Sequence, residues 1–104
     1  MKIERENRAE RNIQQFADEH QLTMRVTEYA SPPRTWRFAA SFKGVEVMEP
    51  CVLVGVYGDG NTENEAIADY AKRISGKRLA ENAMSPERRE FYAPQFLPYD
   101  PGAV

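Results

Sequence analysis

The sequence predicts an α+β domain, in which two helices cover one face of an antiparallel sheet. Apolar residues recur at helical spacing near residues 4–20 and 62–76, whereas polar and apolar residues alternate between these segments. Prolines and glycines separate the alternating runs, as expected for short strands joined by turns. With 104 residues, the chain suits one domain. We therefore predict an α-β-β-β-α two-layer sandwich over residues 1–93, followed by an irregular tail over residues 94–104 that is extended or flexible.

The first helix is predicted over residues 4–20. Ala9, Ile13, Phe16 and Ala17 fall on one face of it, and charged residues fill the other faces. His20 ends this helix, where a cation would interact favourably with the helix dipole.

Three alternating runs predict the strands, at residues 22–29, 35–42 and 45–57. The inward side chains of the second run are mostly aromatic: Trp36, Phe38 and Phe42. Lys43-Gly44 predicts a hairpin turn between the second and third runs. Glu49-Pro50 interrupts the third run, which is either one bulged strand or two strands.

The second helix has the clearest local signals. Gly58 and Gly60 precede it and predict backbone with positive φ. Thr62 is the predicted N-cap, and Glu65 completes a capping box three residues later. Gly76 is expected to end the helix in a left-handed conformation. After it, the segment around Leu79 is either a short fourth strand or an irregular return.

Composition excludes several classes of function. The formal net charge is −2, so no overall attraction to nucleic acid or to an anionic membrane is expected. No apolar run is long enough for a transmembrane helix, and the charged start is unlike a secretory signal. A single cysteine rules out an internal disulfide. We therefore expect a cytoplasmic protein that binds no membrane.

No motif predicts catalysis, a cofactor or a metal site. The Gly58-Asp59-Gly60 turn lacks the Gly-Lys-Ser/Thr of a Walker A motif. The acidic residues around it are better explained by helix capping than by a cation site. Cys51 is expected to be a small buried hydrophobe, with a reactive thiol as the alternative. We therefore predict that the protein is not an enzyme and needs no cofactor.

The clustered bases are the main candidate for a partner-binding patch. They follow the middle of the second helix and have an aromatic neighbour; the set is Lys72, Arg73, Lys77, Arg78, Arg88, Arg89 and Tyr92. Neighbouring glutamates dilute the positive charge, so a solvated surface is the alternative interpretation. A patch of this kind would bind nucleic acid or an acidic protein.

The order of elements over about residues 8–75 resembles the double-stranded RNA-binding domain. The resemblance rests on the first helix, on Trp36 to Phe42 followed by a turn and a strand, and on Gly58-x-Gly60 before the second helix. In that family, lysines at the start of the second helix contact phosphates. The matching residues here are Glu63, Asn64 and Glu65, whose carboxylates would repel phosphate, so nucleic-acid binding is only the alternative function.

A second resemblance covers about residues 55–94. The run from Gly58 through Thr62 and Glu65 to Gly76, with Arg88-Arg89 before Pro94, looks like a stretch in small uncharacterised bacteriophage and prophage proteins. It implies a phage or prophage origin. The resulting prediction is a non-enzymatic accessory protein that acts in the bacterial cytoplasm by binding a macromolecule, most readily a protein.

Overall fold

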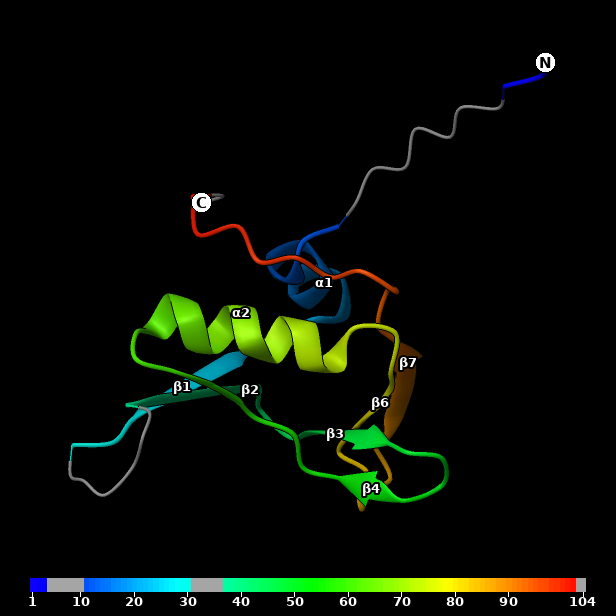
Figure 1. Cartoon of the computed structure of the whole chain (residues 1–104). Coiled ribbons are helices and arrows are strands. Elements are labelled where there is room, and N and C mark those ends of the chain that lie inside the picture. The colour runs from blue at the N-terminus through cyan, green and yellow to red at the C-terminus, as the bar shows by residue number, and fades with distance from the viewer. Residues whose placement is uncertain (4–10, 31–36, 103–104) are drawn as a thin grey trace.

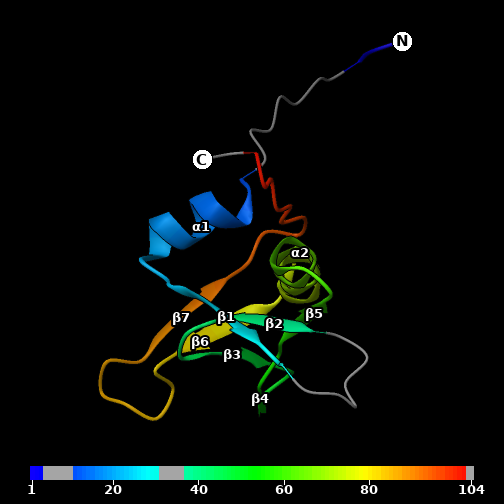
Figure 2. The same ribbon diagram turned by 90° about the vertical axis from the view of Figure 1, so that its left-hand side faces the viewer.

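The computed structural model describes residues 1–3, 11–30 and 37–102. In these residues it contains two helices and seven strands in two antiparallel sheets (Figure 1). The predicted α+β class is confirmed. Both helices lie on the same side of the sheets, as the view along α2 shows (Figure 2). The helices are α1 (Ile13–His20) and α2 (Glu63–Ile74).

The described strands form two sheets, whereas a single sheet was predicted. The first sheet has the order β1-β2-β5 and consists of β1 (Met24–Glu28), β2 (Phe38–Phe42) and β5 (Gly58–Gly60). The second sheet has the order β4-β3-β6-β7 and consists of β4 (Leu53–Val54), β3 (Val45–Met48), β6 (Arg78–Glu81) and β7 (Arg89–Tyr92).

The predicted hairpin at Lys43-Gly44 is wrong, and this error explains the difference in sheet number. Strand β2 pairs with β1 and β5, whereas β3 pairs with β4 and β6, so β2 and β3 do not pair with each other. Gly44 has a φ of +73° and bends the chain from the first sheet into the second. The chain reverses further on, where the Glu49 amide donates to the Val52 carbonyl at 2.9 Å. The interrupted third run is therefore two strands.

Helix α1 begins later than predicted. Its N-cap is Asn12, whose φ of −84° and ψ of 171° are extended, so a continuous helix over residues 4–20 is wrong at this position. Asn12 and Gln15 form a capping box, which supplies the start signal. Ala9 and Trp36 lie outside the described residues.

Helix α2 agrees with its prediction at both ends. The Glu65 amide donates to the Thr62 hydroxyl at 3.1 Å, and the Thr62 amide donates to the Glu65 carboxylate at 3.1 Å. Gly76 has a φ of +72° directly after the C-cap. The buried face of the helix consists of Ala66, Tyr70, Ala71 and Ile74. Burial raises the pKa of Tyr70 to about 12, so this phenol stays neutral at physiological pH.

Gly58 and Gly60 are required for a reason other than the predicted one. The glycines with positive φ in the described residues are Gly44 and Gly76, so positive φ at Gly58 and Gly60 is wrong. Instead, β5 lies directly against the backbone of α2. A Cβ at Gly58 would lie 2.1 Å from the Ala66 carbonyl oxygen, and one at Gly60 would lie 2.6 Å from the Ala66 amide nitrogen.

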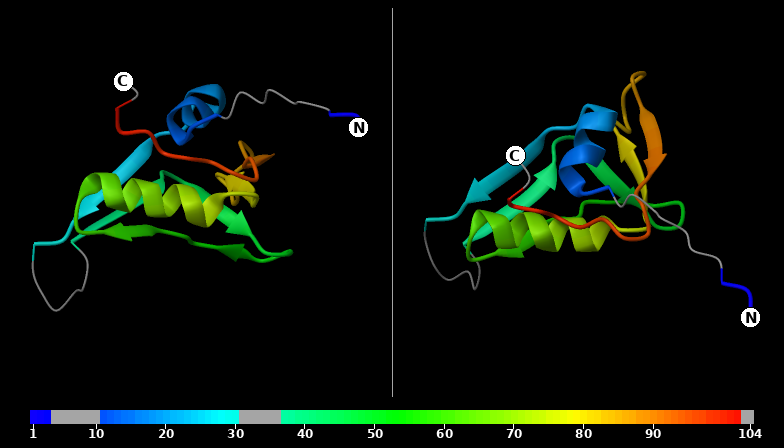
Figure 3. Two further views of the ribbon diagram at one scale, coloured as in Figure 1. Left: turned by 45° about the horizontal axis from the view of Figure 1, so that its top comes forward. Right: turned by 90° about the horizontal axis from the view of Figure 1, so that it is seen from above.

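The segment after β7 runs in extended form between the two helices (Figure 3). The Gly76 amide donates to the Pro94 carbonyl, and the Ile13 amide donates to the Pro98 carbonyl, each at 2.7 Å. Leu97 is buried in the same core as Phe16 of α1 and Ile74 of α2. This segment therefore connects α1 to α2 by packing and by backbone hydrogen bonds.

Candidate functional site

The structure pairs most of the predicted basic set with carboxylates. The Arg73 Nε donates to Asp69 at 2.8 Å, and Lys77 forms an ion pair with Glu49. Arg78 and Arg88 both pair with Glu90, and Arg89 pairs with Glu81. Lys72 is the basic residue of the set for which the described residues provide no carboxylate. Paired guanidinium groups have less capacity to attract an anionic partner than free ones.

Only part of this set lies on one surface. Arg78 and Tyr92 are opposite each other in the β6–β7 ladder, and Arg88 reaches the same Glu90 that pairs with Arg78. Arg89 lies on the other face of this sheet, because successive side chains of a strand alternate. Its guanidinium donates to the His20 carbonyl at 2.6 Å and thereby caps the end of α1.

His20 lies between two aromatic rings. Its ring stacks on Phe91 with centroids 4.4 Å apart and contacts Phe16 at 4.7 Å. Burial lowers the pKa of His20 below its ordinary value of 6.5, and the Arg11 and Arg89 guanidinium groups lower it further. The imidazole is thus a packing group at the end of α1.

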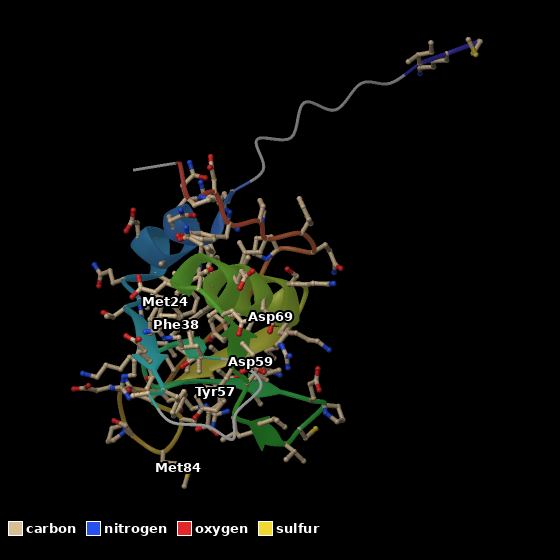
Figure 4. The ribbon with its side chains drawn as sticks, turned by 60° about the vertical axis from the view of Figure 1, so that its left-hand side comes forward. Met24, Phe38, Tyr57, Asp59, Asp69 and Met84 are labelled. Atoms are coloured by element: carbon tan, nitrogen blue, oxygen red, sulfur yellow. The ribbon has the colours of Figure 1, made fainter. Side chains whose placement is uncertain are left out.

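The acidic residues near the glycine corner have structural roles. The Asp59 amide donates to the Asp69 carboxylate at 2.8 Å, which connects β5 to α2 (Figure 4). The Glu65 carboxylate accepts from the Asn61 amide at 2.8 Å. Within residues 1–3, 11–30 and 37–102, no three His, Cys, Asp or Glu side chains converge as metal ligands. Cys51 is exposed near the β3–β4 turn, so its predicted burial is wrong.

The structure forms a concave site from residues other than the predicted basic set. An open groove of about 670 Å³ lies on the face of the first sheet that is opposite α2. The alternation of side chains places Arg25 and Thr27 of β1 beside Ala39 and Ser41 of β2 on this face. The remaining lining comes from segment 43–46, segment 55–57 and the loop over residues 82–85.

The loop between β6 and β7 closes one end of the groove. Asn82 has a φ of 52°, and its amide donates to the Gly44 carbonyl at 3.0 Å. The Ser85 amide donates to the Asn82 carbonyl at 2.9 Å. These bonds position Met84, whose side chain projects from the loop and is 92% exposed (Figure 4). Tyr57 lines the groove from the β4–β5 segment and is 59% exposed.

The charges of the groove differ from those of the predicted basic set. Arg25 and Lys43 line the groove, and neither forms an ion pair with any carboxylate in the part of the chain that the structure describes. Of the described residues that line the groove, Glu46 is the one with a carboxylate. The groove therefore combines free positive charge with an exposed aromatic ring and an exposed thioether.

Sequence reasoning missed this site because its parts come from distant segments. The alternation at Arg25, Thr27 and Tyr29 does mark one polar face of a strand. What encloses that face is the loop over residues 82–85, which reaches it through the pairing of β6 with β3. Nothing local in the sequence specifies that pairing.

Comparison with known proteins gives no family for the chain. No family model matches it, and neither a curated protein nor a solved structure matches it either. In the described segments, no helix has the length and apolar character needed to cross a membrane.

Proposed function

We propose that this protein is a non-enzymatic binding module that acts by contacting another protein through the groove on its first sheet. The observation that carries the proposal is the exposure of Tyr57 and Met84 at the groove, which Arg25 also lines without a carboxylate partner among the described residues. Tyr, Met and Arg are enriched at protein interfaces, and Tyr and Arg dominate binding hot spots. A tyrosine ring also provides a large contact area at a low cost in side-chain entropy.

The chemistry of the lining supports binding rather than catalysis. The described residues that line the groove include neither histidine nor cysteine, so the serine and threonine hydroxyl groups at Thr27, Ser41 and Ser85 have no imidazole or thiol beside them there. Nucleophilic catalysis at a hydroxyl needs a base within hydrogen-bond reach.

The biological setting belongs to the same proposal. The resemblance of residues 55–94 to small phage and prophage proteins supports an accessory role in the cytoplasm of a bacterial host. With such an origin, the partner would be a protein of the bacterial host or of the phage. The alternative partner, duplex RNA, would meet the carboxylates of Glu63 and Glu65 at the start of α2.

Site-specific photocrosslinking tests the proposal. A benzophenone amino acid is placed at Tyr57 or at Met84. The control position is Phe96, whose exposed fraction of 61% is close to the 59% of Tyr57 and which is not among the lining residues of the groove. We expect one discrete protein to be crosslinked from the two groove positions and not from Phe96. The crosslinked partner is then identified and purified. The affinity of the Tyr57→Ala variant for this partner should be about tenfold weaker than that of the wild type. Identical crosslinks from all three positions, or an unchanged affinity, would contradict the proposal.

A further inference from the structure

We propose that the groove binds an extended acidic segment of its partner, in which two carboxylates are separated by one residue. This inference rests on the proposed function and names the chemistry that the groove recognises. Arg25 and Lys43 would contact the two carboxylates, while Tyr57 and Met84 would contact apolar side chains of the same segment.

The register of β1 and β2 places the backbones of Arg25 and Lys43 close together on one face of the sheet. Arg25 lies opposite Ser41, and the ladder continues to the Lys43 amide, which donates to the Thr23 carbonyl at 2.8 Å. Arg25 and Lys43 are therefore diagonal neighbours on one face of the sheet. The Cα atoms of diagonal neighbours in an antiparallel pair are about 7–8 Å apart.

This backbone separation is close to the two-residue repeat of an extended chain, and the long side chains of Arg25 and Lys43 extend from it into the groove. Residues i and i+2 of a strand lie on the same side and are roughly 6.5 Å apart, because each residue advances the chain by about 3.3 Å. An acid-x-acid segment in extended form can thus place one carboxylate at each cation. Acids at adjacent positions would point to opposite sides and could not do so.

Charge in the groove favours a short acidic segment over a nucleic acid. Among the described residues, the lining holds Arg25 and Lys43 against Glu46, which is an excess of one positive charge. Tight binding to a nucleic-acid strand requires several cations along the phosphate backbone. Polar lining groups at Thr27, Ser41 and Asn82 provide hydrogen-bond partners for the backbone of a peptide.

Selection from a random dodecapeptide library on the full chain tests the inference. We expect the bound peptides to be enriched in Asp or Glu at i and i+2, beside an apolar or aromatic residue. For synthetic peptides of that pattern, Arg25→Glu and Lys43→Glu should each weaken binding about tenfold. A peptide of the same composition with its acids at i and i+1 should also bind about tenfold more weakly. Melting temperatures of the variants verify that each is folded.

Lys72→Glu provides the matched comparison, because it makes the same charge change at an exposed lysine of α2 that, within the described part of the chain, has no carboxylate partner and does not line the groove. The affinity of the Lys72→Glu variant for the selected peptides should stay within twofold of the wild-type affinity. A loss with Lys72→Glu equal to that with Arg25→Glu would overturn the groove as the site. Selected peptides without acidic pairs, or Arg25-dependent binding of a single-stranded oligonucleotide, would overturn the acidic segment. If crosslinking at Tyr57 still identifies a partner whose bound segment is not acidic, the proposed function stands and this inference fails.

Discussion

Replacing Gly58 with alanine should destabilise the protein more than any other single methyl addition in the glycine corner. The added Cβ would lie 2.1 Å from the Ala66 carbonyl oxygen and 2.3 Å from the Tyr70 amide nitrogen. Heavy atoms in contact prefer about 3.5 Å, so β5 and α2 would have to separate by roughly 1 Å. Both obstructing atoms belong to the backbone of a helix, and no side chain can rotate away. Overpacking typically costs 1–3 kcal/mol, and we expect about 3 kcal/mol here.

Urea unfolding followed by circular dichroism measures this cost. With a slope of about 1.5 kcal/mol per M, the midpoint of Gly58→Ala should fall by about 2 M. Gly55→Ala is the matched control, because its Cβ would meet the Tyr57 ring at an ordinary 3.7 Å. The control should change the free energy of unfolding by no more than about 0.5 kcal/mol. A Gly58→Ala protein with a wild-type midpoint would refute the close approach of β5 to α2.

Three further predictions concern the helices. Thr62→Ala removes the N-cap of α2 and should cost about 1 kcal/mol in urea unfolding; an unchanged midpoint would show that the capping box contributes nothing. Leu97→Ala leaves a cavity where the C-terminal segment packs between the helices and should cost about 2–4 kcal/mol by the same assay, whereas a frayed segment would give almost no change. Because the pKa of His20 is lowered in the folded state, the unfolded chain binds its proton first as the pH falls. The stabilisation by neutral His20 is therefore complete above pH 6.5 and is lost progressively below it. The free energy of unfolding should therefore fall less between pH 7.5 and 5.5 in the His20→Gln variant than in the wild type. An equal fall in the two proteins would contradict a lowered pKa of His20 in the folded state.

The parts of the fold that the sequence predicts well are those with local causes. Thr62, Glu65 and Gly76 act within one helical turn of the ends of α2, so their residue types are sufficient to place that helix. Around Leu79 the sequence predicts either a strand or an irregular return, because a segment of about four residues has too weak a periodicity to distinguish them. Its pairing with Val47 and Phe91 in the second sheet makes it a strand.

The parts that the sequence does not predict depend on pairing between distant segments. Lys43-Gly44 has the composition of a turn, and a bend with positive φ at Gly44 satisfies that composition as well as a hairpin does. Whether the chain reverses or crosses to a second sheet is decided by β6, more than thirty residues later. The groove has the same origin, since the loop that encloses it follows β6.

Net charge was also a poor guide to the groove, and the pattern of ion pairs explains why. The chain carries a formal charge of −2, which predicts no general attraction to anions. Yet Asp69, Glu81 and Glu90 are each paired with an arginine outside the groove, so their charges are compensated where they lie. Recognition depends on the charges that remain unpaired at a concave surface, because these are desolvated by a partner without first breaking an internal bond. By this criterion Arg25 and Lys43 matter more than the longer basic run on α2, β6 and β7, which the sequence made conspicuous.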